Sequence, residues 1–397
     1  MVGSGGREHA LAWRLAASPS LTGLHAAPGN PGIATLGHCH PVRAEDSEGL
    51  LTLASSLGID LVVVGPEAPL VAGVADELRH SGISVFGPGR GAAEIEGSKS
   101  FAKDVMRAAG VPTAATMPIA RPPCVVKADG LAAGKGVVVC RTREELEAGL
   151  AELSALGGSL VIEELLEGAE VSLFALCDGR QALALPPARD YKRAFAGDRG
   201  ANTGGMGAYA PVAELDASEI VELVDLVHRP VLAELARRGR PFVGLLYAGL
   251  MLTETGPKVL EFNCRFGDPE TQAVVPLVDG DFLALLAAAA RGELAGARVE
   301  GTGGAAVTVV LAAARYPEAG DRGSPIAGLD DAEAEGALVF HSGTALQGSQ
   351  LVTNGGRVLA VTGRGKTVAD ARAAAFAAAE RISFSGVRYR ADIAADA

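Results

Sequence analysis

Apolar and polar positions alternate between a helical and a strand-like pattern over the first hundred residues. The stretch "EHALAWRLAAS" has apolar residues at helical spacing, whereas "GIDLVVVGPEAPL" holds a continuous apolar run that ends at a Gly-Pro turn. A second helical pattern, "LVAGVADELRHSG", is followed by a second short apolar run, "ISVFGP". This alternation predicts βαβ units with a parallel sheet. Ligand loops of such sheets lie at the carboxyl ends of strands, which here are "APGNPG" and "GPEAPL".

The pattern becomes β-rich after a helix that is predicted from about Ser98 to Ala109. Short strand-like pieces with one helix, "TREELEAGLAEL", predict a small antiparallel subdomain, the lid, over about 113–185. A long helix, two strands and a final strand-and-helix unit follow. We therefore expect an α/β protein of three parts: an N-terminal parallel βαβ domain (1–95), a core of two α+β subdomains (96–300) and a small C-terminal α+β domain (301–397).

The charge balance limits the partners of the chain. With 35 Lys and Arg against 47 Asp and Glu, the net charge of −12 argues against a sequence-independent nucleic-acid or anionic-membrane partner. The five cysteines form no C-x-x-C pair, which fits reduced thiols and predicts neither disulfides nor a zinc site. The longest apolar run, "FLALLAAAA", is too short to span a bilayer. We expect a soluble cytoplasmic protein with small-molecule ligands.

The stretch "VVKADGLAAGKGVVV" is the most informative segment of the chain. It places Lys127 on a strand and Gly130, Gly134, Lys135 and Gly136 in a loop that leads to a second strand. A Walker loop ends in Ser or Thr and opens a helix, so this segment is not one. The pattern favours a β-hairpin that covers phosphates; the alternative is a flexible surface hairpin.

A strand that ends in charged residues follows in "LVIEELLEGAEVS". Glu163 and Glu164 with Leu166 resemble a hinge where adenine contacts backbone groups, and Glu170 is placed to accept the ribose hydroxyls. The alternative is a solvated strand end.

The stretch "KVLEFNCRFGDPETQ" carries candidate metal ligands. Glu261 and Asn263, two residues apart on a strand, point to the same face and offer two oxygen ligands for a Mg²⁺ that also bridges phosphates. Arg265 and Asp268 follow in a turn. The apolar neighbours indicate an interior strand, where a Glu needs a partner; the alternative is a polar edge strand.

Two glycine-rich loops point to an anionic substrate. In "ARDYKRAFAGDRGANTGGMGAYAPV", Asp190 and Lys192 lie beside a long glycine loop. The opening "MVGSGGREHA" runs into a helix, as phosphate-binding loops do. It departs from the dinucleotide fingerprint because Glu8 stands where the last glycine is expected. Only Met1 and Val2 precede the loop, so the strand that normally holds it is expected to be truncated. An upstream extension is then expected to raise stability.

Ten stretches in this order resemble the phosphoribosylamine–glycine ligases of the ATP-grasp superfamily over nearly the whole chain. They are "GSGGREHALAW", "APGNPG", "VGPEAPL", "EGSKSFAK", "VVKADGLAAGKGV", "VIEELLEGAEVS", "NTGGMGAYAP", "GLLYAGLM", "EFNCRFGDPETQ" and "VTNGGRVLAVTG". The resemblance implies an ATP-grasp core and a cytoplasmic, monomeric enzyme of de novo purine biosynthesis. It implies ligation of glycine to 5-phosphoribosylamine through a glycyl phosphate, giving glycinamide ribonucleotide, ADP and phosphate.

The resemblance also assigns roles to residues. ATP is expected to contact Lys99, Lys103, Lys127, Gly134, Lys135, Gly136, Glu163, Glu164, Leu166 and Glu170. Glu261 and Asn263 are expected to bind Mg²⁺ or Mn²⁺. The substrates are expected to contact Gly5, Gly6, Arg7, Glu8, Asn30, Glu67, Asp190, Lys192 and Arg265. The catalytic residues implied are Arg265, Lys127 and Asp268. Arg265 would hold the glycine carboxylate or the acyl phosphate, and Asp268 or Asp190 the glycine ammonium.

Two other functions stay open. One is another ATP-grasp carboxylate–amine ligase or a carboxylase, against which "GSGGREHA" and "RFGDPETQ" argue. The other is a non-catalytic nucleotide-binding protein. The presence of Lys127, Glu261 and Asn263 argues against it, because buried charges without a ligand cost stability.

Overall fold

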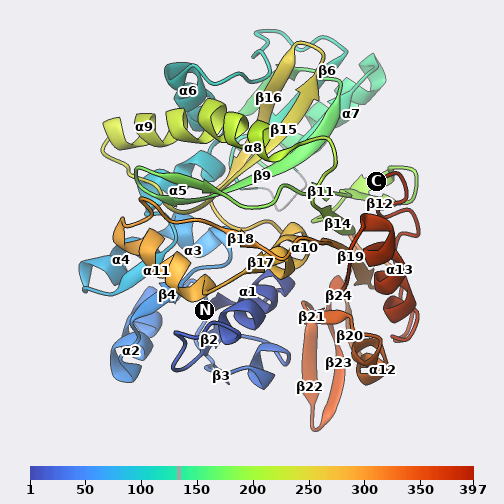
Figure 1. The fold of residues 1–397 in the computed structure, drawn as a ribbon. Helices are drawn as coiled ribbons and strands as arrows, with labels where there is room; N and C mark the ends of the chain where they lie inside the picture. Colours follow the sequence, from blue (N-terminus) through green and yellow to red (C-terminus); the bar gives the residue numbers. More distant parts are fainter. Residues whose placement is uncertain (132–135) are drawn as a thin grey trace.

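The computed structural model describes residues 1–131 and 136–397, and the chain folds into three regions that share apolar cores (Figure 1). One core cluster contains Leu11 from the N-terminal region, Phe174 from the central region and Ala306 from the C-terminal region. Another has members from Val2 to Cys264. Ligand loops of different regions are therefore held against one another by common packing.

The N-terminal region is a parallel sheet with helices, as the sequence predicts. Parallel pairing and a bridge between Val2 and Val64 give the strand order β3-β2-β1-β4-β5. The strands are β1 (Val2–Gly3), β2 (His25–Pro28), β3 (His38–Cys39), β4 (Leu61–Val63) and β5 (Ser84–Phe86). The helices are α1 (Gly6–Ala16), α2 (Ser47–Leu57), α3 (Glu67–Ala72), α4 (Val74–His80) and α5 (Arg90–Gly97).

The first strand, which the sequence predicts to be truncated, is present as a short strand. β1 has two residues, and Val2 pairs with Ala27 on one side and bridges Val64 on the other. The Met1 nitrogen donates to the carbonyl of His25 at 2.7 Å. Two residues suffice because strands on both sides complete their hydrogen bonds, and Val2 is 3% exposed.

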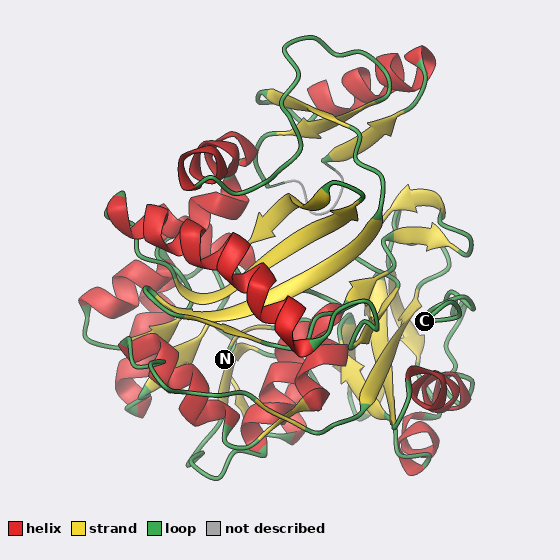
Figure 2. Ribbon diagram, turned by 45° about the horizontal axis from the view of Figure 1, so that its top comes forward, coloured by secondary structure: helices red, strands yellow, loops and turns green. Residues whose placement is uncertain are grey.

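The central region contains two antiparallel sheets, of which the smaller stands apart with one helix (Figure 2). The small sheet has the order β7-β6-β8, formed by β6 (Cys124–Ala128), β7 (Val137–Cys140) and β8 (Leu160–Glu164), and carries α7 (Arg143–Ser154). The large sheet has the order β10-β9-β15-β16, formed by β9 (Ala169–Asp178), β10 (Ala182–Ala184), β15 (Val243–Thr253) and β16 (Gly256–Asn263).

The lid subdomain differs from the expected range of 113–185. The small sheet ends at Glu164, and the next two strands, β9 and β10, pair into the large sheet. The reason is burial: every residue of β9 from Val171 to Asp178 is buried, and β15 pairs with β9 along its whole length.

Helices flank the large sheet and position its ends. The predicted helix from Ser98 to Ala109 is confirmed as α6 (Lys99–Ala109), with the Ser98 hydroxyl accepting from the Phe101 N–H. The long helix predicted after it is a continuous run of α8 (Ala217–Leu223), a π-helical segment (Val224–His228) and α9 (Arg229–Arg237). Short α10 (Glu270–Val274) follows β16, and α11 (Phe282–Arg291) leads to the last region.

The C-terminal region shares a sheet with the central one. The five-stranded sheet has the order β11-β14-β19-β24-β21 and packs α13 (Val368–Ala379) against two of its strands. Its strands are β11 (Arg189–Asp190), β14 (Gly207–Ala210), β19 (Ala305–Ala312), β21 (Leu338–His341) and β24 (Arg357–Gly365). Because β11 and β14 precede the large sheet's β15, the expected boundary at residue 301 divides one sheet.

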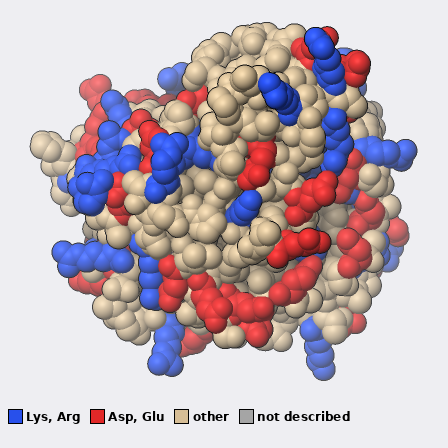
Figure 3. All heavy atoms as spheres, turned by 90° about the horizontal axis from the view of Figure 1, so that it is seen from above, with Lys and Arg blue, Asp and Glu red and all other residues tan. Residues whose placement is uncertain are grey.

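Smaller elements complete the fold. They are β12 (Arg193–Phe195), β13 (Arg199–Asn202), β17 (Val278–Asp279), β18 (Glu300–Gly301), β20 (Asp321–Pro325), α12 (Leu329–Ala334), β22 (Thr344–Gln347) and β23 (Gln350–Gly355). None of the described helices is both long and apolar enough to cross a bilayer. On the face drawn in Figure 3, acidic side chains form a band and basic side chains are dispersed.

Candidate active site

A buried carboxylate joins two of the predicted phosphate-binding lysines. Glu163 on β8 is 2% exposed, and its two oxygens lie 2.8 Å from Lys103 Nζ and 2.8 Å from Lys127 Nζ. Lys127 also donates to the carbonyl of Leu260 at 2.7 Å. Burial lowers the pKa of Lys103, against the opposing charge of Glu163. The lysines are therefore oriented and partly neutralised by the protein itself.

The predicted hairpin is present as β6 and β7, with Lys127 paired to Val137. Gly136 lies at its base, where its carbonyl accepts from the Ala128 N–H at 2.8 Å. The predicted loop residues Gly134 and Lys135 lie outside the described residues. Lys99 begins α6 and donates from Nζ to the carbonyl of Gly130 at 3.0 Å, so it lies beside the start of this loop.

The residues predicted to hold adenine and ribose do not converge through their side chains. Glu163 and Glu164 are neighbours on a strand and point to opposite faces. Glu164 accepts from Lys258 Nζ at 3.0 Å and from the Ala115 N–H at 2.9 Å. Leu166 is half-buried in the link between β8 and β9. Glu170, in β9, forms an ion pair with Lys192.

The candidate metal ligands lie together at the end of β16. Glu261 pairs with Gly249 of β15 and Asn263 with Tyr247, so both side chains share one face. Burial raises the pKa of Glu261, but the charges of Lys192, Lys127 and Lys99 hold it below its ordinary value. Glu261 forms no ion pair with any described residue. Its charge is therefore compensated at a distance, and its oxygens stay available.

The two oxygen donors suit a Mg²⁺ that is completed by phosphates and water. Mg²⁺ in phosphoryl-transfer sites is held by one or two protein ligands and the substrate phosphates. Within residues 1–131 and 136–397, no three or more His, Cys, Asp or Glu side chains are grouped closely enough to hold a metal ion alone. The amide nitrogen of Asn263 donates to Glu96 Oε1 at 3.2 Å, and no described residue donates a hydrogen bond to its oxygen.

Arg265 is held between two carboxylates and links the first two regions. Its Nε lies 3.0 Å from Glu67 Oε2, and its second terminal nitrogen lies 3.0 Å from Glu96 Oε1. Burial lowers the pKa of Arg265, but Glu96 and Glu67 outweigh it and hold this pKa above its ordinary value. Glu96 was not predicted. Its signal is an acidic residue at the end of the amphipathic helix that precedes Lys99.

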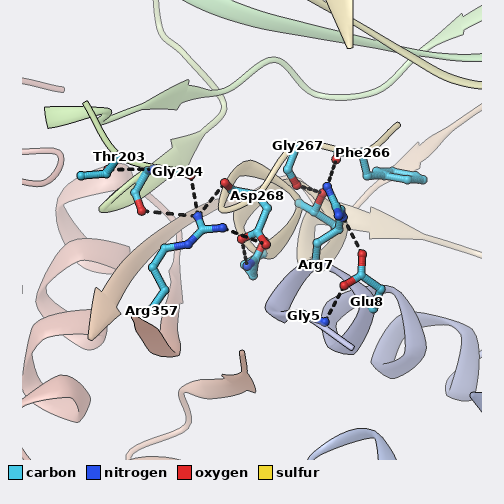
Figure 4. A network of polar contacts seen from close by, with 12 residues as sticks. Gly5, Arg7, Glu8, Thr203, Gly204, Phe266, Gly267, Asp268 and Arg357 are labelled. Atoms are coloured by element: carbon cyan, nitrogen blue, oxygen red, sulfur yellow. Dashed lines mark hydrogen bonds and ion pairs between the residues drawn. The ribbon is translucent and has the colours of Figure 1, made fainter. Parts of the chain in front are cut away.

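The opening loop contacts the turn after β16 (Figure 4). Glu8 accepts from the Gly5 N–H at 2.6 Å and pairs with Arg7 at 2.6 Å, while Arg7 donates to the carbonyl of Phe266 at 3.0 Å. Glu8 is 2% exposed, so this side chain is turned inward. A Cβ at Gly6 would lie 2.4 Å from Ser342 Oγ, which brings the C-terminal region to the same loop.

The side chain of Asn30 forms hydrogen bonds with main-chain groups of the opening loop and its surroundings. Its nitrogen donates to the carbonyls of Ser4 at 2.8 Å and His341 at 2.9 Å, and its oxygen accepts from the Ile33 N–H. The expected substrate contacts of Asn30 and Glu8 stay predictions, because protein groups already pair with the polar atoms of both side chains.

Asp268 is clamped by an arginine that the sequence did not single out (Figure 4). Arg357 on β24 lies 3.2 Å from Asp268 Oδ2 and donates to the Asp268 carbonyl at 2.8 Å. It also donates to the carbonyl of Gly204 at 2.5 Å. Burial raises the pKa of Asp268, but Arg357 and Arg7 hold it below its ordinary value. The signal for Arg357 was its place beside the glycine pair in "TNGGRVLAVTG".

The last cluster gathers acidic groups around Lys192. Lys192 pairs with Glu170 and lies 3.7 Å from Asp190 Oδ1. Burial raises the pKa of Asp190 to about 8, although Lys192 lowers it. Glu270 on α10 is 5% exposed and was also not predicted. Burial raises its pKa, opposed by its own N–H and by Lys192.

The chain matches three family models in order. They describe the N domain of phosphoribosylglycinamide synthetase over residues 1–96, its ATP-grasp (A) domain over 97–271 and its C domain over 306–396.

Similar proteins match the whole chain. A phosphoribosylamine–glycine ligase of Streptomyces coelicolor is 50% identical over all of this chain and 98% of its own length. One of Rhizobium meliloti is 47% identical over 99% of this chain and 97% of its own.

Solved structures show the same arrangement. The phosphoribosylamine–glycine ligase of Thermotoga maritima has a TM-score of 0.85 and 37% identity, covering 99% of this chain and 98% of its own. A biotin carboxylase domain of Hydrogenobacter thermophilus, solved with MgADP and bicarbonate, has a TM-score of 0.68 at 18% identity, covering 98% of this chain and 90% of its own. The second likeness concerns the fold alone.

The opening glycine loop, the hairpin with Lys127 and the β16 strand with Glu261 and Asn263 thus occur in a chain that matches these models and relatives along its length. The chain belongs to the phosphoribosylglycinamide synthetase family, an ATP-grasp family of ligases.

Proposed function

We propose that this protein joins glycine to 5-phosphoribosylamine with cleavage of ATP to ADP and phosphate, an ATP-dependent carbon–nitrogen ligation of purine biosynthesis. The observation that carries the proposal is the position of Glu261. It lies on β16, a partly buried strand, within electrostatic reach of Lys99, Lys127 and Lys192, and it forms no ion pair with a described residue. Family membership over the whole chain supports the choice of substrates.

The nucleotide end of the site provides positive charge in fixed positions. Lys99 and Lys127 are proposed to contact the ATP phosphates under the β6–β7 hairpin, while Glu163 keeps Lys103 and Lys127 in place. Glu261 and Asn263 would hold Mg²⁺, or Mn²⁺, which when bound neutralises phosphate charge. Arg265 is proposed to act at the acyl phosphate while Glu67 and Glu96 fix its plane.

The proposed reaction has two steps. A glycine carboxylate oxygen attacks the γ-phosphorus of ATP, and the bond to the ADP oxygen breaks, giving glycyl phosphate. The amine nitrogen of phosphoribosylamine then attacks the acyl carbon and loses a proton, and phosphate departs. Both steps need alignment and charge neutralisation more than a strong base. A site built from lysines, arginines and carboxylates meets that need.

The opening loop is proposed to bind the phosphate of phosphoribosylamine. The main-chain groups at Gly5 and Gly6 precede an eleven-residue helix whose N-terminus favours anions. A Cβ at Gly5 would lie 3.6 Å from Asp268 Oδ2, so this loop borders the turn that carries the catalytic candidates. We further propose that the protein acts as a cytoplasmic monomer.

The experiment that tests the function is a phosphate-release assay with ATP, glycine and freshly generated phosphoribosylamine. We expect phosphate only when all three are present. Glu254→Gln, in the exposed turn between β15 and β16, is the matched control and should behave as the unchanged protein. Phosphate release that does not require glycine would reject the ligase and favour another ATP-grasp reaction, such as carboxylation.

A further inference from the structure

Most carboxylates of the site already have a cationic partner in the protein. Asp268 and Asp190, the two residues predicted to contact the glycine ammonium, both have such a partner. Asp268 pairs with Arg357, and Asp190 lies 3.7 Å from Lys192. A carboxylate that already carries an ion pair gains less from a second cation, because part of its charge is neutralised.

Glu270 differs from these residues. It is 5% exposed, and it forms no ion pair with any residue that the structure describes. Its neighbours by charge are Lys192, Arg265 and Asp268, which places it among the catalytic candidates. A buried carboxylate without a cation is costly, so a protein that retains one gains from a ligand that supplies the missing charge.

The carboxylate of Glu270 lies so close to Gly267 that a larger side chain at position 267 would collide with it. A Cβ built at Gly267 would lie 2.6 Å from Glu270 Oε2 and 3.0 Å from Oε1. Gly267 therefore leaves room for this carboxylate within the turn that also carries Arg265 and Asp268.

We propose that Glu270 binds the ammonium group of glycine and thereby selects an α-amino acid as the acyl substrate. This inference rests on the proposed function and names the contact that recognises one of its substrates. The chemistry is complementary: glycine brings one ammonium, and Glu270 brings one carboxylate that no described residue pairs. Glu261 also forms no ion pair with a described residue, and it is assigned to the metal.

The contact also accounts for rejection of simple carboxylic acids. Acetate offers the same carboxylate for phosphorylation but no ammonium, so its binding leaves Glu270 buried and unpaired. Sites that pair a substrate's polar group reject analogues without that group far better than apolar pockets do. Discrimination between glycine and acetate is therefore expected to depend on this one side chain.

The test is Glu270→Gln, with steady-state constants for each substrate. We expect the KM for glycine to rise about 30-fold or more, as for loss of a buried charge pair, and the KM for ATP to stay within about 2-fold. Glu254→Gln is the matched exposed control. A larger glycine-specific effect in Asp190→Asn or Asp268→Asn than in Glu270→Gln would overturn the assignment.

A second measurement separates recognition from a structural role. Hydroxylamine converts acyl phosphates to hydroxamates, so ATP-dependent hydroxamate formation from glycine and from acetate reports the first step without phosphoribosylamine. Glu270→Gln should narrow the preference for glycine over acetate, whereas a structural defect would lower both products together.

Two further results keep the inference separate from the function. If the unchanged protein forms no glycine-dependent product, the proposed function fails. If it does and Glu270→Gln retains its KM for glycine, only the inference fails. Should Glu270→Gln not fold, Glu270→Asp and Gly267→Ala take its place, and both should raise the KM for glycine; an unchanged value in both would contradict the inference.

Discussion

Two buried carboxylates of this protein have opposite surroundings. Glu163, on the small sheet, lies 2.8 Å from each of two lysines, and the protein supplies its whole complement of charge. Glu270, beside the large sheet, is almost as deeply buried but pairs with no described residue. The first holds the nucleotide-binding lysines in place, whereas the second is left for a ligand.

The contrast separates structural from functional charges in the site. A pair such as Glu163 with Lys103 and Lys127 is satisfied before any substrate arrives, and its loss exposes uncompensated charge. An unpaired carboxylate weakens the free protein and gains its partner from a ligand, which is the usual trade between stability and activity. Glu261, opposite three more distant lysines, belongs with Glu270 in this respect.

The largest expected effect is that of Glu261→Ala. Loss of the carboxylate should lower kcat about 10³-fold or more, since phosphate charge is then no longer neutralised in the proposed metal site. The fold should persist, because the side chain forms no ion pair with a described residue. Turnover and Mg²⁺ titrations check this. Near-normal activity of Glu261→Ala at limiting Mg²⁺ would contradict the assignment of Glu261 as a metal ligand.

Glu163→Gln should reduce stability more than any other single change at these carboxylates. It leaves Lys103 and Lys127 buried without their partner, at a cost of about 3–5 kcal/mol. Denaturant unfolding measures this loss of stability, and Glu164→Gln is the matched control. Glu164 pairs with Lys258 nearer the surface, a contact worth about 0–1 kcal/mol. Equal losses of stability in Glu163→Gln and Glu164→Gln would contradict the structural role assigned to Glu163.

Arg357→Ala is expected to give an intermediate effect at the Asp268 turn. Removing the arginine leaves Asp268 without its ion pair and frees the carbonyl of Gly204, at a cost of about 1–3 kcal/mol. The KM for the amine substrate should rise more than the KM for ATP. Arg364→Ala, an exposed arginine on the same strand, provides the control. Equal changes in both constants would indicate a general loss of structure.

The smallest effect concerns a buried neutral group, His228. Burial lowers its pKa to about 4, and its Nδ1 has no hydrogen-bond partner among the described residues. The unfolded chain therefore binds a proton first as the pH falls below about 6.5, and stability is lost over this range. Between pH 7.5 and 5.5 the free energy of unfolding should therefore fall by about 1 kcal/mol less in His228→Gln than in the unchanged protein. A variant with the same pH dependence of unfolding would contradict this.

The sequence predicts the elements better than their grouping into sheets. Helical and strand periods locate α6, β4 and the β6–β7 hairpin because each pattern is local. Strand partners are long-range, and this is why β9 was placed with the lid when its buried length pairs with β15. The same limitation hid that β11 and β14 join the C-terminal sheet. The two residues of β1 give no periodic signal, so the sequence predicts only a truncated strand there.

For the site, the sequence located charged residues but not their partners. Glu261, Asn263 and Lys127 stand out because charged or polar side chains interrupt apolar strands. Pattern alone could not tell that Arg265 is held by Glu96, a contact over 169 positions, or that Arg357 reaches Asp268 from another region. Glu270 gives no signal in the sequence, because an acidic residue just after a turn is usually exposed to solvent. Whether a carboxylate is paired is a property of the folded chain.

The central claim, that the protein leaves Glu270 unpaired for a ligand, is tested most directly by thermal unfolding of Glu270→Gln at pH 7.5 without ligands. Burial raises the pKa of Glu270 in the folded chain, so its ionisation opposes folding as the pH rises through that value. The neutral variant should therefore unfold at a midpoint about 2 °C higher than the unchanged protein. A lower midpoint, as expected for Glu163→Gln, would show that Glu270 already has its partner within the protein and would contradict the account.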